Sequence, residues 1–557
     1  MVFLSLLLSG LPAQNTSSTS PSNTASTEGR KLGRVEGTVV NAITNAPLAR
    51  AMVMLQPMSR SGGSSGPMIL ADGFGQMVPQ DTPMSGATGA DGKFVIENVP
   101  EGKYAPLAAR ATFLKGYYAG PGVRGSIEIA AGASVKDITI KLTPQSVISG
   151  RVVDADGEPI QNVMIAAARY NYTNGQRNLM PFGTAQSNDL GEYRISSLQP
   201  GKYFLAAVPG LRSTTAGPSG SREAIPLTYY PNAFEITGAT QVMVDPGGDV
   251  HGMDFRLTRQ PAVIVSGKVA GLPEGAMPSA NLVPDQSLGM LGRMVPHLIP
   301  VRNGTFAIPG VLPGSYELQI DMRTSKSPIP LYGRLHVEVG KEDVKGLNIA
   351  VEPGAVVTGS LRVEGGELRI PVSAIQIMLR RPDGVIVQPA TPEKDLTFQI
   401  SSVPPGKYSP QLFTPEGFYI KSIKVDDRQS EEVDAIPQAH IKVDIVLAAG
   451  GGVVTGTVEG PDGKPAAGAF VTTHWADGAT SRPDREKIAI SDAKGAFKLQ
   501  NLPPGTYRVF AWDDGRTGEW RSAELRKEFE GKSATVKLTE TGNESVTLKV
   551  IPVPQTN

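Results

Sequence analysis

The sequence predicts an all-β protein in which one domain-sized unit is repeated five times. Three observations support this prediction. A strand–turn–strand pattern recurs five times, a strand with a central glycine precedes each recurrence, and glycine and proline are abundant, with 63 and 46 residues of 557. Many short strands joined by turns need such a composition, and no amphipathic helix longer than two or three turns is evident.

The clearest copy of the pattern runs from residue 188 to residue 205. Tyr193 and Ile195 face one way and the polar residues beside them face the other, which is the signature of a half-buried strand. Pro200 and Gly201 follow. Proline presets φ near −65° and glycine accepts a positive φ, so the pair predicts a type II turn before the next strand.

A tyrosine follows the turn in every copy. These tyrosines lie about one hundred residues apart, which is a domain period rather than the roughly 20–50 residues of a solenoid repeat. They are Tyr104, Tyr203, Tyr316, Tyr408 and Tyr507. Upstream of each, a strand with a central glycine reads V-x-G-x-V or a close variant. Those glycines are Gly37, Gly150, Gly267, Gly359 and Gly456. In copies two and five an Asp-Gly hairpin signal follows this strand, at 156–157 and 462–463.

Together the motifs V-x-G-x-V, D-G-x-P, G-x-Y/F-x-I/L and L-x-P-G-x-Y resemble the carboxypeptidase regulatory-like domain. That domain is a transthyretin-like β-sandwich related to collagen-adhesin B-type repeats. The resemblance covers nearly all of the chain after residue 32 and is looser in copies three and four, where D-G-x-P is missing. It implies a seven-strand, mostly antiparallel Greek-key sandwich in each copy. It also implies no catalytic residues, because these domains are accessory modules.

The repeats and the short Pro- or Gly-bearing junctions between them predict the domain boundaries. We expect a tandem array of five antiparallel Greek-key sandwiches, strung end to end, with limited freedom at most joints and more before copy five. The predicted units are a signal-peptide-like segment and Ser/Thr-rich linker at 1–31, then copy one at 32–143 with a loop insertion at 57–88, copy two at 146–258, copy three at 261–352, copy four at 354–449 and copy five at 451–552.

The composition and the N-terminus predict an exported protein without a nucleic-acid partner. Lys and Arg together number 53, and so do Asp and Glu, so the formal net charge is zero. A nucleic-acid binder is expected to be clearly basic. Residues 2–13 form an apolar run of signal-peptide length, and a stretch rich in Ser, Thr, Asn and Pro follows it. The run is too short to span a bilayer, so we expect no transmembrane segment in the mature chain. The expected location is the periplasm, the outer surface or the extracellular space.

No residue pattern predicts catalysis, a metal or a cofactor. The five histidines stand alone in different regions, and cysteine is absent, so neither a zinc site nor a disulfide is expected. The insertion at 57–88 is rich in methionine, which suits copper(I), but a flexible loop is the favoured interpretation. Collagen-adhesin B-type repeats often join a first-strand Lys to a last-strand Asn. Only Lys268 stands at such a position here, without an evident Glu partner, so we predict no isopeptide bonds.

The aromatic residues of copy five suggest a second interpretation. All three tryptophans of the chain lie there, and alternation places Phe510 and Trp512 on one face of a strand, with Val509 and Ala511 on the other. Exposed aromatics beside carboxylates can grip sugar rings. The candidate carbohydrate-binding residues are Trp475, Trp512, Trp520, Asp513 and Asp514. The alternative is that the tryptophans fill the core of the domain.

These observations predict a non-catalytic, exported scaffold of the cell envelope, acting as an adhesion, binding or spacer protein. The alternative function is a carbohydrate-binding protein with an aromatic platform in copy five. The partner could be a polysaccharide or a protein of the envelope or the extracellular space, and the sequence is compatible with either class.

Overall fold

A computed structural model describes residues 31–553, except 58–83, 119–124, 174–175, 209–214, 217–221, 275, 277, 285–288, 295–297, 323–329, 369, 382–385, 413–416, 477–481, 483–484 and 514–517. Strands dominate the described residues, which confirms the all-β prediction. The helices in this part of the chain are one or two turns long: α1 (Gly289–Met294), α2 (Ala523–Glu528), η2 (Ile236–Gly238), η3 (Val372–Ala374), η5 (Glu519–Arg521) and η6 (Glu530–Lys532).

Copies one and two each place two sheets around a buried apolar cluster. The strands of copy one are β1 (Gly33–Asn41), β2 (Met52–Pro57), β3 (Met84–Ala87), β4 (Lys93–Val99), β5 (Gly102–Ala109), β6 (Gly116–Tyr117), β7 (Ile127–Ile129) and β8 (Ser134–Leu142). They form sheets ordered β4–β1–β8 and β3–β2–β5–β6, with β7 also on β5. The strands of copy two are β9 (Ser146–Val153), β10 (Met164–Thr173), β11 (Gln176–Gln186), β12 (Glu192–Leu198), β13 (Gly201–Val208), β14 (Thr215–Ala216), β15 (Arg222–Ala224), β16 (Thr228–Tyr229), β17 (Gln241–Val244), β18 (Asp249–Val250) and β19 (Phe255–Arg256). Its main sheets are β12–β9–β18, with β19 on β9, and β11–β10–β13–β16, with β17 on β13.

Copies three and four repeat the plan with one difference in strand pairing. The strands of copy three are β21 (Val263–Ala270), β22 (Ser279–Pro284), β23 (Leu298–Pro300), β24 (Thr305–Val311), β25 (Gly314–Met322), β26 (Leu331–Val339), β27 (Val344–Ala350) and β28 (Glu352–Pro353), and β20 (Gln260–Pro261) precedes them. Their sheets are β24–β21–β27 and β23–β22–β25–β26–β28, while β20 joins β14 and β15. The strands of copy four are β29 (Ala355–Glu364), β30 (Ile377–Arg380), β31 (Thr397–Val403), β32 (Gly406–Leu412), β33 (Phe418–Val425), β34 (Arg428–Gln429), β35 (Val433–Ala435) and β36 (His440–Ala449). Here β33 lies in the first sheet, ordered β31–β29–β36–β33–β34, beside a second sheet β30–β32–β35.

In copy five the strands join into one continuous sheet that wraps around its core. The strands are β37 (Gly452–Glu459), β38 (Phe470–Trp475), β39 (Ile488–Ile490), β40 (Ala496–Leu502), β41 (Gly505–Trp512), β42 (Ala534–Leu538) and β43 (Asn543–Ile551). Their order is β39–β38–β41–β43–β37–β40, with β42 also on β41. The predicted β-sandwich fold is thus confirmed, whereas the exact domain boundaries stay a prediction.

The recurring tyrosine has the same hydrogen bond in every copy. Its hydroxyl donates to the backbone carbonyl four residues earlier, at 2.6–3.0 Å. The glycine two residues before it has φ between +135° and +157°, wider than the roughly +80° of a type II turn. The predicted type II turn is therefore wrong in detail. The tyrosine side chain closes the connection instead, and burial raises the pKa of Tyr203 and of Tyr316 to about 12.

The central glycine of each first strand is required by a close approach to the last segment of its copy. The first strand pairs in parallel with that segment, for example β37 with β43 and β29 with β36. A Cβ atom at any of the five glycines would lie 1.8–2.3 Å from a backbone carbonyl oxygen of this segment. No side chain fits at that distance.

We therefore expect Gly456→Ala to destabilise copy five by about 1–3 kcal/mol, because the strands must separate to admit the methyl group. Gly531→Ala is the matched control, since nothing lies within 4 Å of a Cβ atom there. Denaturant unfolding followed by tryptophan fluorescence measures copy five alone, because it holds all three tryptophans. Equal midpoints for the two variants would contradict the steric account.

Lys268 and Asn348 lie directly opposite each other on the parallel strands β21 and β27. Both side chains are exposed, whereas an isopeptide bond of this kind forms beside a carboxyl group in a protected setting. We expect the intact mass of the purified chain to show no loss of ammonia, and Lys268→Ala to leave thermal unfolding unchanged. A mass deficit of one ammonia that Lys268→Ala abolishes would overturn this prediction.

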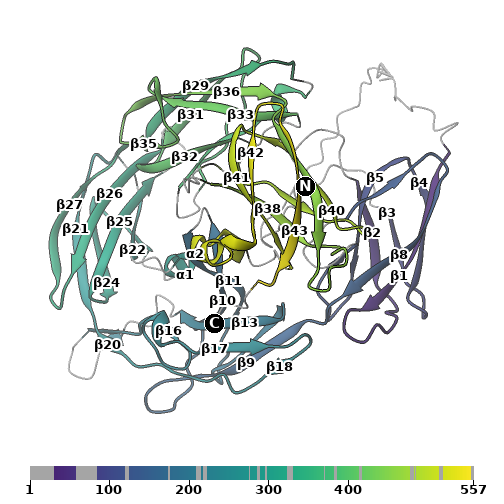
Figure 1. Cartoon of the computed structure of the whole chain (residues 1–557). Coiled ribbons are helices and arrows are strands. Elements are labelled where there is room, and N and C mark those ends of the chain that lie inside the picture. Colours follow the sequence, from purple (N-terminus) through teal and green to yellow (C-terminus); the bar gives the residue numbers. More distant parts are fainter. Residues whose placement is uncertain are drawn as a thin grey trace, which may run out of the picture.

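The copies do not form an open string. Figure 1 shows copies two to five around a closed ring, with α1 and α2 in its middle and copy one to the side. Strand β10 of copy two contacts η5 of copy five, so the last copy returns to the second. Helix α1 of copy three contacts β11 of copy two, where Leu291 is fully buried beside Leu179 and Phe204. The expected end-to-end arrangement is therefore wrong, and the greater freedom expected before copy five stays a prediction.

Candidate functional site

The outer face of β38 and β41 in copy five holds the predicted aromatic residues. The predicted alternation is confirmed: Val509 and Ala511 lie in the core of the sandwich, and Phe510 and Trp512 lie in a second cluster on the opposite face. That opposite face is not exposed to solvent. The segment η5–α2–η6 folds over it, with Trp520 fully buried in the same cluster.

The aromatic cluster is packed like a core rather than open like a binding platform. Trp512 has no exposed surface, stacks on Phe510 at 5.3 Å and meets the edge of Phe529 at 6.1 Å. Trp520 lies 5.8 Å from Phe470 between ring centroids. Trp512 and Trp520 therefore offer no face on which a sugar ring could stack, and the expectation that they are exposed is wrong.

The remaining predicted residues are separated from this cluster. Trp475 is half-buried at the other end of β38, where Tyr507 contacts its edge at 5.1 Å and the guanidinium of Arg485 covers it at 4.3 Å. Asp513 is exposed and its Oδ1 accepts a hydrogen bond from the Val553 amide at 2.8 Å. Asp514 lies outside the described residues. The four predicted residues that the structure describes do not converge on one surface.

A buried polar network runs beneath the cover instead. The indole Nε1 of Trp512 donates to Thr472 Oγ1 at 3.1 Å, and the same hydroxyl lies 3.1 Å from His474 Nε2. On the other side of the ring, His474 Nδ1 lies 3.3 Å from Glu486 Oε1, although the contact is not aligned as a hydrogen bond. A carboxylate beside Nδ1 favours the tautomer with hydrogen on Nδ1, which lets Nε2 accept from the Thr472 hydroxyl.

Glu486 also faces the cover segment. Its Oε2 lies 3.5 Å from Arg521 Nε in η5, and Arg521 stacks on the Trp520 ring at 4.0 Å. Burial by itself would raise the pKa of Glu486, but His474, Arg521 and Arg526 outweigh burial and hold that pKa below its ordinary value. Burial lowers the pKa of His474 and the pKa of both arginines. At neutral pH the network therefore holds an ionised Glu486 beside a neutral His474.

Thr472, His474 and Glu486 follow the order of a hydrolytic triad, in which a hydroxyl, an imidazole and a carboxylate lie in a row. Here, however, the three groups are enclosed by the protein. Thr472 has no exposed surface and His474 is only 2% exposed, so no substrate atom can approach the hydroxyl. The hydroxyl also accepts the indole hydrogen, which fixes it in place. The network joins the cover to the sheet.

We expect acidification to weaken copy five before the rest of the chain. Since the pKa of His474 is lowered in the folded state, neutral His474 contributes stability that is complete above its unfolded value of 6.5 and is lost as pH falls below it. The groups that face it are Glu486, Arg521 and Arg526. The denaturant concentration at the unfolding midpoint, followed by tryptophan fluorescence, should decrease as the pH is lowered from 7.5 to 5.5. A midpoint that stays constant over that range would refute this assignment.

The same region of copy five contacts copy four. Arg482 is 4% exposed and donates from Nη2 to the Ile420 carbonyl at 2.5 Å. Glu431 lies 3.0 Å from Arg485 Nη2 and 3.8 Å from Arg482 Nη1. At the edge of this contact, Lys421 Nζ lies 3.7 Å from Glu540 Oε1. A buried cation that bonds a backbone carbonyl of another copy fixes their relative orientation.

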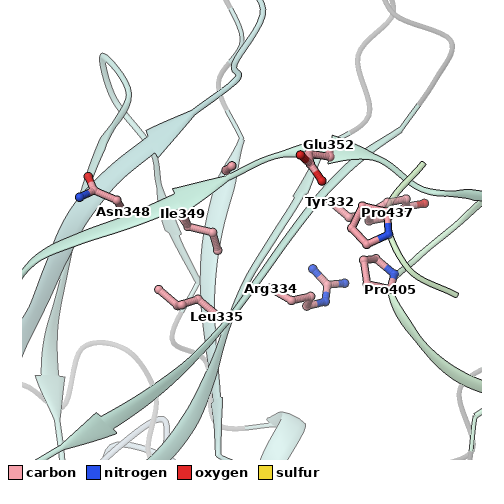
Figure 2. Close-up of a pocket in the computed structure, with 9 residues that line it drawn as sticks. Tyr332, Arg334, Leu335, Asn348, Ile349, Glu352, Pro405 and Pro437 are labelled. Atoms are coloured by element: carbon pink, nitrogen blue, oxygen red, sulfur yellow. The ribbon is translucent and has the colours of Figure 1, made fainter. Parts of the chain in front are cut away.

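A pocket of about 340 Å³ lies at the joint between copies three and four. Figure 2 shows Leu335, Asn348 and Ile349 on one side of it. The other side holds Tyr332, Arg334, Pro405 and Pro437, with Glu352 at the rim. The Tyr332 hydroxyl donates to the Ser402 carbonyl at 2.9 Å, which ties the two copies together beside the pocket.

Sequence reasoning missed both the buried network and this pocket. The histidine, glutamate and arginine of the network are spread over residues 474–521 without a motif, and the residues that line the pocket come from two different copies.

Among the described residues no three His, Asp or Glu side chains gather as metal ligands. None of the described helices has the length and apolarity that a bilayer span requires.

Comparisons with known proteins agree with the motifs. The sequence model of the carboxypeptidase regulatory-like domain matches residues 147–258 and 453–549. Colossin-A of Dictyostelium discoideum is 24% identical over 283 residues, which are 47% of this chain and 2% of that protein. This chain therefore spans only a small part of that relative.

Solved structures similar to this chain include two pilins. GBS52, the minor pilin of Streptococcus agalactiae, is 15% identical with a TM-score of 0.23, over 41% of this chain and 97% of that one. The full-length RrgB pilus protein of Streptococcus pneumoniae is 11% identical with a TM-score of 0.16, over 95% and 99%. Scores this low carry no argument about function. The family match is the informative one, because two separate segments, residues 147–258 and 453–549, match the carboxypeptidase regulatory-like domain.

Proposed function

We propose that this chain is a non-catalytic scaffold of the cell envelope, exported from the cytoplasm, whose β-sandwiches present binding surfaces. The observation that carries the proposal is the direct bonding between copies. Arg482 bonds the Ile420 carbonyl across one joint, and Tyr332 bonds the Ser402 carbonyl across another. Hydrogen bonds between neighbouring copies hold their loops and strand edges in fixed positions, which suits recognition of a large partner.

The closed ring favours a binding role over a spacer role. A spacer gains length from copies placed in line, whereas here copy five folds back against copy two. Small-angle scattering of the purified chain tests this arrangement. We expect a radius of gyration near the roughly 24 Å of a compact chain of this length. A value about twice as large would indicate copies in line and would remove the argument for a fixed scaffold.

Export rests on the apolar run at residues 2–13 and the polar stretch after it. Fractionation of cells that express the full-length precursor should recover the chain outside the cytoplasm, shortened at its N-terminus. Recovery of uncleaved chain in the cytoplasm would reject export without affecting the scaffold role.

The carbohydrate-binding alternative loses its support because Trp512 and Trp520 are buried.

A further inference from the structure

One face of the second sheet of copy four lies in the core of the copy, and the other face is turned toward the ring. Ile377 and Leu379 of β30 belong to the core. Because side chains alternate along a strand, Met378 and Arg380 lie on the opposite face, together with Gln411 of β32, which pairs with Met378. Figure 1 shows β32 on the side of copy four that faces the middle of the ring. This face is covered as well, since Met378 is 7% and Gln411 is 9% exposed.

Arg380 is a half-buried cation without a counter-charge. No acidic side chain in the described part of the chain acts on its guanidinium, and burial alone lowers its pKa. The structure also gives this side chain no hydrogen bond to a described residue. Of its three nitrogens only Nε is enclosed, so the two Nη atoms at the tip remain open to solvent. A buried charge without a partner is costly, and a bound anion would remove that cost.

Gln411 supplies a second unmatched donor beside Arg380. Met378 lies directly opposite Gln411, and Arg380 lies two residues further along β30 on the same face. Diagonal neighbours of this kind on two paired strands are within reach of long side chains. The Gln411 Nε2 is enclosed and has no hydrogen-bond partner among the described residues. Two neighbouring unmatched donors, one of them charged, call for an acceptor that carries negative charge.

A second cation faces this place from copy five. Burial lowers the pKa of Arg521, Glu486 raises it, and the positive charge of Arg380 lowers it again, so the two guanidinium groups are within electrostatic reach although they belong to different copies. Glu486 and Glu524 act on Arg521 and Arg526, which balances these two arginines. The charge of Arg380 is left over. One uncompensated positive charge favours a ligand with one negative charge, such as a carboxylate.

We propose that Arg380 and Gln411 of copy four, together with Arg521 of copy five, bind the carboxylate of a small ligand, which links the two copies inside the ring. The carboxylate accepts hydrogen bonds from the Arg380 guanidinium and the Gln411 amide, and its charge faces Arg521. Hydrogen bonds between ionised groups are roughly twice as strong as neutral ones, which suits a small ligand with few contacts. The site goes beyond the scaffold function proposed above and does not depend on export.

The test measures thermal unfolding of the full chain by tryptophan fluorescence while acetate replaces chloride at constant ionic strength. A ligand that binds only the folded state raises the unfolding temperature as its concentration rises. We expect a rise of at least about 3 °C at about 100 mM acetate. D-galacturonate and N-acetylglycine carry the same group on a sugar and on a peptide end, so the tighter of the two identifies the source that the site prefers.

Arg380→Met keeps the length of the side chain and removes its charge. We expect this variant to lose the acetate-dependent rise and, without acetate, to unfold no earlier than the natural chain, because an unpaired cation has left a half-buried place. An arginine with a purely structural role would give the reverse, earlier unfolding with an unchanged response to acetate. Gln411→Leu should reduce the apparent affinity for acetate several-fold, since one donor is lost.

Arg194→Met in copy two is the matched control, because Arg194 is exposed on β12. Its response to acetate should equal that of the natural chain. Equal unfolding temperatures in acetate and in chloride, or an Arg380→Met variant that responds like the natural chain, would overturn the proposal. A phosphate-dependent rise that exceeds the acetate-dependent one and is lost in Arg380→Met would also overturn it, because the site would then take more than one negative charge.

Discussion

Glu486→Gln should lower the free energy of unfolding of copy five by about 1.5–3 kcal/mol, because it leaves two partly buried arginines without their carboxylate. Glu486 lies within 3.5 Å of Arg521 and of His474, and Arg526 adds a second positive charge. Glutamine has nearly the same shape, so the change removes charge rather than packing. The expected effect therefore measures the electrostatic contribution of the network.

The experiment is denaturant unfolding of the full chain followed by tryptophan fluorescence, which reports copy five because all three tryptophans lie there. Glu540→Gln is the matched control. That carboxylate is 63% exposed and lies 3.7 Å from Lys421, so its loss should cost about 0–1 kcal/mol. If both variants unfold at the same denaturant concentration, Glu486 does not hold the cover on the sheet.

Trp512→Ala should destabilise copy five by about 3–5 kcal/mol, the range for removing a large buried aromatic side chain. Trp512 has no exposed surface, and its removal leaves a cavity against Phe510 and Phe529 and takes the hydrogen-bond donor from Thr472. The signal comes from the fluorescence of Trp475 and Trp520, which remain. A sugar-binding platform would predict the opposite: loss of ligand with little change in stability.

Trp512→Phe separates packing from the hydrogen bond. Phenylalanine keeps most of the apolar contact and loses the indole N–H, so we expect a smaller loss that includes about 1 kcal/mol for the missing bond. A Trp512→Ala variant as stable as the natural chain would show that the cover leaves the sheet in solution. The exposed platform would then become the better description of this face.

Much of the local structure followed from the sequence. The alternation of Tyr193 and Ile195, the central glycines and the recurring tyrosines all indicated strands, and each one occupies its predicted place. These features depend on neighbours one or two residues away or on a steric limit at one position. The type II turn was the exception, because the bond that closes it comes from the tyrosine side chain rather than from the backbone.

The candidate site depended on contacts between distant residues. Alternation correctly placed Phe510 and Trp512 on one face, but no local signal indicated that residues 519–532 would cover that face. The covering segment is short, and its only α-helix, α2, has six residues, too few for a recognisable apolar stripe. The pocket between copies three and four also required knowing which strand of each copy enters which sheet.

The sequence by itself determined the strands, their buried faces, the repeat and the family of two of its copies. The tertiary structure alone decided that the copies close into a ring and that Trp512 and Trp520 are buried. The reason is physical. A period of two residues reports which side chains share a face, whereas the cover on that face is chosen by packing against a segment outside the strand, which leaves no periodic trace in the chain.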